Sequence, residues 1–509
     1  MTHRYRLPPI SRHLRCGVLA LMPVLNAALI SSPLLHVTAL SLAASTAAHA
    51  DSFDDPNALP TLGQPADLIA DGPTEQRLGQ AWLRQLRGSA ALWPDPLVRD
   101  YIEGLLYKLS MHTSLQQPNF SSVVIDDTQI NAFAVPGGVI GVNTGLILSS
   151  DSEDELASVL SHELGHLSQR HFARSQEANQ YNQWLALAGL LASIAGAAAG
   201  AGGDLGVAVG ASAQAIAVQN QLRYSRAYEQ EADRLGLQTL IDAGYDPRAM
   251  PAFFLKLDRN TRRLGYLPEF LLTHPLSSTR LSDLARRVAD SPRTALTNHP
   301  EFQFIQVRLQ VAYSKQLDEL ITAFRNSLDS NSNTDASRLG LSLALLRKAD
   351  IIGARDALAP LLKSDPNRLD FRISDIDLDL ATRNYASAYE KARDSLALFP
   401  NQPSLLQRLT KAALPLGKAD AIRADLDRAV LSRPNDNGLW RLIADCSLKQ
   451  QDGLGVFRSR AEYLFLEGRQ LAAEDQLNNA LRLAGENYSL STQLQRRLVV
   501  MRKLNQEFR

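Results

Sequence analysis

Residues 152–166 read Ser-Glu-Asp-Glu-Leu-Ala-Ser-Val-Leu-Ser-His-Glu-Leu-Gly-His, and this stretch has the signals of a helix start. Ser152 and Glu155 form a capping box, and the acidic residues around them suit the positive end of a helix dipole. Apolar residues then follow at helical spacing, namely Leu156, Val159, Leu160, Leu164 and Leu167. We therefore expect one helix that begins here and continues to about Ser175.

Two histidines and a glutamate lie within this predicted helix. His162 and His166 are four residues apart, which places both imidazoles on one face, one turn apart. Such a pair can bind one zinc ion, and zinc lowers the pKa of a bound water and polarises a peptide carbonyl. Glu163 can act as the general base that takes a proton from that water and gives it to the leaving amine. The alternative is an ordinary helix with two histidines by chance.

A catalytic zinc site needs a third protein ligand and an open position. The segment Glu229-Gln230-Glu231-Ala232-Asp233 offers carboxylates on a second predicted helix, residues 224–244. Glu229 can complete the ligand set, and Asp233, four residues later on the same face, can accept a hydrogen bond from a ligating imidazole. Spacing alone does not separate Glu229 from Glu231, and an acidic, solvated helix face is the alternative for these residues.

The residues before the metal-binding helix predict a small sheet that follows two helices. The helices are expected at 74–88 and 97–109, a strand at 120–126, a short apolar run at 130–135, and a further strand or strand-turn segment at 139–148. The turn sequence Pro136-Gly137-Gly138 separates the last two segments. We further expect residues 139–143 to form an edge to which an extended substrate adds by main-chain pairing. An interior strand is the alternative for that segment.

The C-terminal part has an internal repeat. Pro366-Asn367, Pro400-Asn401 and Pro434-Asn435 recur at a spacing of 34 residues, which is the period of tetratricopeptide helix pairs. Ala354 and Ala388 also lie 34 residues apart, and chance coincidence is the alternative. We therefore predict an α+β zinc metallopeptidase domain, mostly helical with a small sheet, at 51–290. A helical linker at 291–330 and an all-α tetratricopeptide-type solenoid at 331–509 follow.

The first 50 residues differ from the rest of the chain. A basic start is followed by an apolar stretch and by the small residues Ala47-Ala48-His49-Ala50. This order is typical of a secretory signal peptide, here residues 1–50, cleaved near Ala50. We therefore expect an exported, periplasmic protein, and an N-terminal membrane anchor is the alternative.

Two further features concern partners. The chain has 53 basic and 53 acidic residues, so its charge does not indicate a nucleic-acid partner. Residues 184–218 are rich in Ala and Gly, and Gly202-Gly203-Asp204 interrupts them. We expect a helical hairpin or a flap near the active site there, with possible contact to a membrane surface. A hairpin within the membrane is the alternative.

The motifs together resemble the zinc metallopeptidase family that includes HtpX and the CAAX prenyl proteases. In that family the glutamate that opens E-x-x-A-D is the third ligand, so the resemblance implies Glu229. Residues 131–138 also resemble the strand and turn before the family's metal helix. Residues 84–90 and 272–276 are similar to the periplasmic members that assist assembly of outer-membrane beta-barrel proteins. The likeness covers nearly all of the mature chain and is loose in the repeats.

The resemblance also implies a role for the Thr273-His274-Pro275 loop. In such proteases this histidine can occupy the open position of the zinc and hold the enzyme inactive. An ordinary loop histidine is the alternative, and the residues alone favour it. Arg280 can fix that loop, whereas His171 is predicted to be structural, turned away from the metal face.

The predicted function is that of an exported endopeptidase with one Zn²⁺ per chain, for quality control and assembly of outer-membrane beta-barrel proteins. The resemblance implies misfolded or stalled outer-membrane proteins as substrates and the barrel-assembly machinery as the partner of the repeat domain. Repeat solenoids present concave binding surfaces. The alternative is a chaperone-like periplasmic binding protein or scaffold whose peptidase site is mostly closed.

Overall fold

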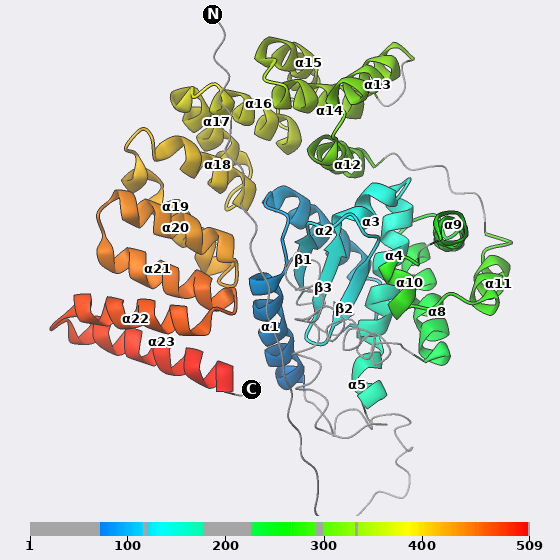
Figure 1. The fold of residues 1–509 in the computed structure, drawn as a ribbon, viewed down its shortest axis with the longest axis horizontal. Coiled ribbons are helices and arrows are strands. Elements are labelled where there is room, and N and C mark those ends of the chain that lie inside the picture. The colour runs from blue at the N-terminus through cyan, green and yellow to red at the C-terminus, as the bar shows by residue number, and fades with distance from the viewer. Residues whose placement is uncertain are drawn as a thin grey trace, which may run out of the picture. The chain divides into compact units, whose positions relative to one another are not determined.

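The computed structural model describes residues 72–115, 120–176, 225–265, 267–291, 299–330 and 334–506. The predicted signal peptide and the segment 184–218 lie outside the described residues. The N-terminal elements are α1 (Gly72–Ser89), α2 (Pro96–Ser110), β1 (Ser121–Ile125), β2 (Ala132–Val135), β3 (Val139–Asn143), α3 (Thr144–Ser149), α4 (Glu153–Ser168), α5 (His171–Gln176), α8 (Arg226–Asp242), α9 (Ala249–Leu264), α10 (Glu269–Thr273) and α11 (Ser278–Arg287). Figure 1 shows these helices around one small sheet, as the sequence predicts.

The sheet has three strands in the order β1-β3-β2. β3 is parallel to β1 and antiparallel to β2, and the turn between β2 and β3 uses Gly137 and Gly138 at φ 82° and 78°. Glycine adopts this left-handed conformation without the steric cost that other residues meet. The expectation that residues 139–143 form an edge is therefore wrong, because β3 pairs on both sides. The strand also ends at Asn143, and the rest of the predicted 139–148 segment is helix α3.

α4 begins where the capping box predicts and ends earlier than expected. Ser152 accepts a hydrogen bond from the amide of Glu155 at the N-terminus. The helix stops at Ser168, because Arg170 has a left-handed backbone with φ 49°, and its guanidinium lies 2.8 Å from the carboxylate of Glu75. The predicted single helix to Ser175 is thus two helices, α4 and α5. The turn between them brings the side chain of His171 into contact with His166.

The C-terminal region is all helical in its described residues. Its elements are α12 (Pro300–Tyr313), α13 (Leu317–Asp329), α14 (Thr334–Arg347), α15 (Ile351–Ser364), α16 (Leu369–Ala381), α17 (Tyr385–Leu398), α18 (Pro403–Ala413), α19 (Ala419–Ser432), α20 (Asn437–Lys449), α21 (Gly453–Leu466), α22 (Gln470–Ala484) and α23 (Tyr488–Gln506). α12 packs mainly on α14, and from α13 onwards each helix packs mainly on its neighbours in sequence (Figure 1). Pro366, Pro400 and Pro434 lie in the turns after α15, α17 and α19, where the period predicts them. No helix among the described residues combines the length and apolar character needed to cross a bilayer.

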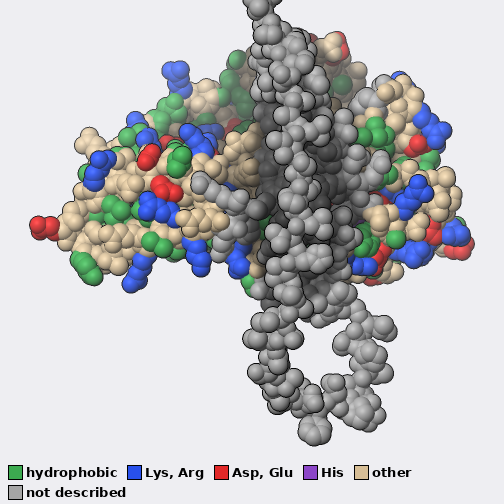
Figure 2. Space-filling view, turned by 60° about the horizontal axis from the view of Figure 1, so that its bottom comes forward, with side chains coloured by type: hydrophobic (Ala, Val, Ile, Leu, Met, Phe, Trp, Pro, Cys, Tyr) green, Lys and Arg blue, Asp and Glu red, His purple; other side chains and the backbone are tan. Residues whose placement is uncertain are grey.

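Ion pairs connect the sheet domain to these helices. Arg408 on α18 is buried and lies 3.1 Å from Asp95 at the start of α2 and 2.8 Å from Asp377 on α16. Arg99 on α2 lies 2.7 Å from Asp436. On the face drawn in Figure 2, the visible basic side chains are interspersed with acidic and apolar ones.

Candidate metal centre

The helices α4 and α8 approach each other closely at two glycines. A Cβ atom on Gly165 would lie 3.0 Å from the carbonyl oxygen of Ala232, and one on Gly236 would lie 2.9 Å from the amide of His162. Any larger residue would therefore separate the helices. This contact holds the acidic face of α8 against the histidine face of α4.

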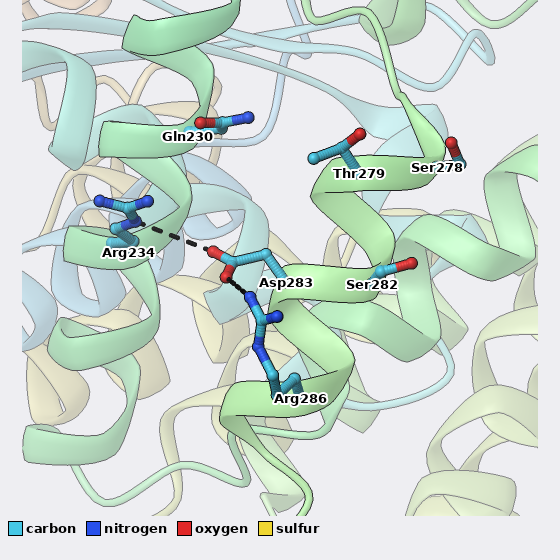
Figure 3. Close-up of a pocket in the computed structure, with 7 residues that line it drawn as sticks. All are labelled: Gln230, Arg234, Ser278, Thr279, Ser282, Asp283 and Arg286. Atoms are coloured by element: carbon cyan, nitrogen blue, oxygen red, sulfur yellow. Dashed lines mark hydrogen bonds and ion pairs between the residues drawn. The ribbon is translucent and has the colours of Figure 1, made fainter.

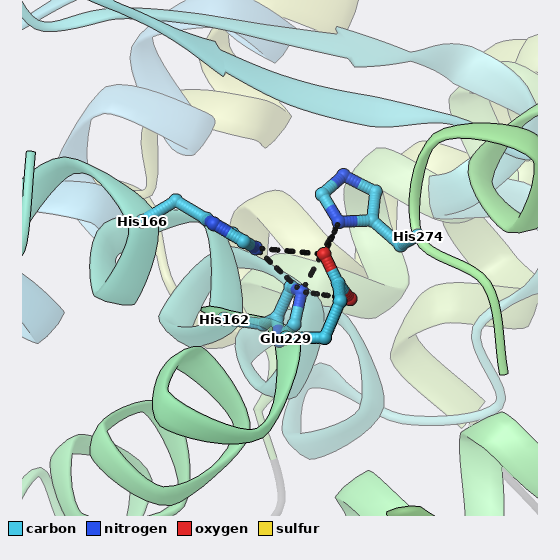
Figure 4. A group of neighbouring side chains, drawn as sticks. All are labelled: His162, His166, Glu229 and His274. Carbon is cyan, nitrogen blue, oxygen red and sulfur yellow. Dashed lines mark hydrogen bonds and ion pairs between the residues drawn. The ribbon is translucent and has the colours of Figure 1, made fainter. Parts of the chain in front are cut away.

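Four side chains converge beside this contact. His162 and His166 come from α4, Glu229 comes from the first turn of α8, and His274 follows α10 (Figure 4). All four are at most 2% exposed. Each offers one ligand atom, and the four atoms lie within 4.8 Å of one another. The structure thus brings together all four predicted metal ligands.

The spacing of the donor atoms fits a single zinc ion, because one ligand atom from each residue lies within 4.8 Å of the others. With metal–ligand bonds of about 2.0–2.1 Å, neighbouring ligands of a tetrahedron lie about 3.3 Å apart. The Nε2 atom of His162 lies 3.1 Å from His166 Nε2, 3.3 Å from His274 Nδ1 and 3.5 Å from Glu229 Oε2. Glu229 Oε1 lies 3.4 Å from His166 Nε2 and 3.1 Å from His274 Nδ1. The residues present therefore fit zinc held by three imidazoles and one carboxylate.

The charges around the histidines favour a cation at this position. Burial opposes a charged imidazole at His162, yet hydrogen bonding to Asp233 and Glu229 raises its pKa to about 9. Burial lowers the pKa of His166 well below its usual range, which keeps that imidazole neutral and able to ligate. Burial also opposes the charge of Glu229, but His274 and the other imidazoles hold its pKa well below the usual range. The neighbouring carboxylates thus favour a positive charge at His162, while His166 stays neutral and Glu229 stays anionic.

Glu163 lies next to the cluster and faces the fourth ligand. Its Oε1 atom is 3.4 Å from Nε2 of His274, whose other nitrogen belongs to the donor set. Burial raises the pKa of Glu163, and the backbone amide of Ala134 on β2 hydrogen-bonds to its carboxylate. A carboxylate with a raised pKa can accept and then return a proton near neutral pH. This is the position and chemistry that the sequence predicts for the general base.

Asp233 and Arg280 contact the candidate ligands His162 and Glu229 and orient them. Asp233 Oδ1 lies 3.1 Å from Nδ1 of His162, as predicted for an acceptor that orients a ligating imidazole. Arg280 donates two hydrogen bonds to Asp233, at 2.6 and 2.7 Å, and lies 2.7 Å from Glu229 Oε2. It also donates to the carbonyl of Pro275, at 2.9 Å, which fixes the loop that carries His274. One guanidinium therefore ties two helices and the loop together.

His171 has a contact that the sequence reasoning missed. Its Nδ1 atom lies 3.0 Å from Nδ1 of His166, and its Nε2 atom lies 3.0 Å from Glu231. The left-handed turn at Arg170 brings this ring back to the metal helix, so it is not turned away as an uninterrupted helix would place it. Glu231 therefore contacts His171. Of these two glutamates, only Glu229 lies among the four candidate metal ligands.

Arg280→Met is expected to weaken zinc binding by about tenfold to a hundredfold, the usual cost of losing a group that orients ligands. The substitution leaves Asp233 and Glu229 without their buried cation, so the ligands lose their fixed orientation. Competition with a zinc-chelating dye measures the affinity. Arg286→Met on the same helix is the matched control, because Arg286 is 76% exposed. Equal affinities for wild type and Arg280→Met would refute the orienting role.

A separate hollow lies on the outer side of α8 and α11. Its volume is about 430 Å³, and its lining residues are Gln230, Arg234, Ser278, Thr279, Ser282, Asp283 and Arg286 (Figure 3). Asp283 lies 3.8 Å from Arg234 and 2.5 Å from Arg286, so two guanidinium groups share one carboxylate at this hollow. It contains none of the metal-ligand candidates.

Comparison with known proteins identifies relatives of this chain. Residues 96–288 match the model of peptidase family M48. The beta-barrel assembly-enhancing protease of Yersinia pestis is 31% identical over 457 residues, which cover 89% of this chain and 93% of the relative. The protein of the same name from Escherichia coli K12 is 31% identical over 87% of this chain and 90% of its own length. The mitochondrial metalloendopeptidase OMA1 of Arabidopsis thaliana is 34% identical over 174 residues.

Proposed function

This chain belongs to peptidase family M48 and is a metallopeptidase, and from that premise we propose that it is an exported zinc endopeptidase for outer-membrane beta-barrel proteins. One observation carries the peptidase chemistry: a buried tetrahedral donor set with the carboxylate of Glu163 beside it. The names of the full-length relatives supply the connection with beta-barrel assembly. The substrates in this proposal are misfolded or stalled barrel proteins.

In this proposal His162, His166 and Glu229 hold the zinc, which supplies Lewis-acid activation of the peptide carbonyl and of water. Glu163 takes the proton of the attacking water at its carboxylate and passes it to the nitrogen of the leaving peptide. Asp233 keeps His162 in the tautomer that presents Nε2 to the metal. Asp233 therefore acts through the ligand and does not touch the substrate.

His274 closes the site in this proposal. Its Nδ1 atom lies 3.3 Å from Nε2 of His162 and 3.1 Å from Oε1 of Glu229, where it would take the ligand position that water or substrate needs during catalysis. Its ring also lies between the donor set and Glu163. The enzyme becomes active when the loop carrying His274 moves away, which requires breaking the hydrogen bond between Arg280 and Pro275.

The outer edge of β2, on the side away from β3, is the strand edge beside the catalytic helix. β2 packs on α4, and the amide of Ala134 reaches Glu163 from that side. Because β2 is an outer strand of the sheet, an extended chain can add to it by main-chain pairing. We assign substrate pairing to this edge in place of β3.

The remaining parts of the proposal concern location and partners. Residues 1–50 act as a signal peptide that directs the chain to the periplasm. The helix pairs of residues 331–509 form a tetratricopeptide-type solenoid that binds the barrel-assembly machinery, with 291–330 as a linker from the peptidase domain at 51–290. The 34-residue spacing of the three turn prolines and the alignment with full-length relatives support this assignment.

A chaperone-like binding protein is the second candidate function. The observation in its favour is the closed site, because a zinc whose four vertices are occupied by protein cannot bind water. Both activities can belong to one chain that opens only for particular clients.

Metal removal tests the proposed function. We expect purified protein to contain about one zinc per chain and to cut a urea-unfolded outer-membrane beta-barrel protein. Phenanthroline should abolish the cutting, and added zinc should restore it; a folded barrel protein serves as the control and should stay intact. The products are measured by gel electrophoresis and mass spectrometry. Zinc-loaded protein that binds the unfolded barrel and never cuts it would favour the binding-protein function.

A further inference from the structure

The second ring nitrogen of the candidate ligand His166 contacts another imidazole. Nε2 of His166 belongs to the donor set and lies 3.1 Å from Nε2 of His162. Its Nδ1 atom lies 3.0 Å from Nδ1 of His171, the first residue of α5. The side chain of His171 is fully buried. The two rings are therefore within hydrogen-bond distance of each other at a place that water does not reach.

Ligation through Nε2 fixes the direction of this hydrogen bond. A neutral imidazole has one N–H and one lone pair, so a His166 that ligates through Nε2 keeps its proton on Nδ1. That N–H donates to Nδ1 of His171, which must therefore carry the lone pair. The proton of His171 is then on Nε2, which lies 3.0 Å from Oε2 of Glu231. Each of the two N–H groups thus has an acceptor within hydrogen-bond distance.

Side chains of α5 and α8 hold the ring of His171 in place. Tyr228 stacks on it, with the ring centroids 4.6 Å apart and 14° between the planes. Arg174 lies 3.2 Å from Glu231, and its guanidinium carbon lies 4.9 Å from the centre of the Tyr228 ring. The stacking sets the plane of the imidazole, and the contacts at its two nitrogens set the rotation within that plane.

The two histidines of α4 therefore have different partners at their second nitrogens. His162 faces the buried carboxylate of Asp233 directly, at 3.1 Å. His166 faces a neutral imidazole, and the nearest carboxylate on that side, Glu231, lies one residue further out. The side chain of Glu231 is 37% exposed, so water screens its charge. The effect of His171 on His166 is therefore one of orientation and tautomer more than of charge.

We propose that His171 is a positioning residue of the metal centre, which accepts the Nδ1–H of His166 and so holds the ring and tautomer that present Nε2 to zinc. Glu231 acts one step further away, by accepting from His171. The proposal rests on the zinc site of the proposed function. It adds α5 to the elements that orient the ligands, and it differs from a packing role because it requires a lone pair at one particular atom.

Zinc titration of three variants at position 171 tests this role on the full-length protein, by competition with a chelating dye. His171→Phe keeps a ring against Tyr228 and offers no acceptor, so it should weaken zinc binding by about tenfold to a hundredfold. His171→Gln reaches toward Glu231 but has no acceptor at the position of Nδ1, so it should bind as weakly as His171→Phe. His171→Asn places an amide oxygen at that position and should recover most of the affinity.

The visible spectrum of the cobalt-loaded protein gives a second readout, because the d–d bands of Co²⁺ report the arrangement of its ligands. The bands should change in His171→Phe and return to the wild-type pattern in His171→Asn. Tyr228→Leu is the packing control, since it removes the stacked ring and leaves the acceptor in place. It should bind zinc more tightly than His171→Phe does.

Equal zinc affinities of wild type and His171→Phe would overturn the proposal. So would equal affinities of His171→Asn and His171→Phe, because the loss would then follow packing and not the hydrogen bond. Glu231→Gln should cost less affinity than His171→Phe and should cost nothing further in that background; a further loss would contradict the order of the contacts. If wild type binds zinc and cuts no unfolded barrel protein, the proposed endopeptidase function fails, while the affinities still decide the role of His171.

Discussion

Glu163→Gln is expected to lower kcat for peptide cleavage by about 10²- to 10⁴-fold, the range for losing a general base. The amide keeps the size of the side chain and cannot take a proton from water. Glu163 is not among the four candidate ligands, so the zinc content should stay at the wild-type level. Initial rates on an unfolded barrel protein and atomic absorption of the same sample measure the two quantities.

Glu390→Gln is the matched control for this substitution. Glu390 on α17 is 68% exposed and has no contact with the donor set among the described residues, so its loss should leave kcat nearly unchanged. A Glu163→Gln protein that keeps more than half of the activity would refute the assignment of the base. Loss of zinc together with activity would instead show that Glu163 holds the metal.

His274→Ala is expected to raise kcat by roughly tenfold to a hundredfold. Catalysis needs the fourth vertex, and wild-type protein must first release His274 from it; each 1.4 kcal/mol of that cost is about a tenfold loss in the open population. His162, His166 and Glu229 remain to bind zinc, as the three protein ligands of catalytic sites do. The rate is measured at saturating zinc, with the metal content determined in parallel.

His112→Ala is the control for His274→Ala, because His112 is an exposed histidine after α2. The double variant Glu163→Gln/His274→Ala should be inactive, which shows that the gained cleavage uses the same base. A fall in kcat with zinc retained would mean that His274 assists the reaction, and the closed-site proposal would be wrong.

The part of the site within α4 is predictable from sequence because its determinants are local. The capping box fixes where the helix begins, and the four-residue spacing of His162 and His166 fixes their common face. Spacing left Glu229 and Glu231 as alternatives for the third ligand. Residues two positions apart on a helix point in directions about 200° apart, so only one of Glu229 and Glu231 can face α4. In the structure Glu229 does so, and Glu231 contacts His171.

The wrong expectations share a physical cause. The early end of α4 and the contact of His171 depend on the left-handed backbone at Arg170, whose guanidinium pairs with Glu75 on α1. The central position of β3 depends on which strands pair with it, and strand order is a matter of tertiary packing. The pattern of apolar residues within α4 or β3 predicts neither the end of the helix nor the position of the strand in the sheet.

The sequence by itself determined the helix faces, the ligand types and the repeat period, because each follows from spacings of a few residues or from an internal repetition. For His274, the resemblance indicated a ligand and the residues alone did not; the tertiary structure places its Nδ1 atom 3.3 Å from Nε2 of His162, 112 residues earlier in the chain. It also decided that Arg280 joins Asp233 and Glu229 to the loop that carries His274. These features arise from contacts between segments far apart in the chain, and only packing of the whole core fixes such contacts.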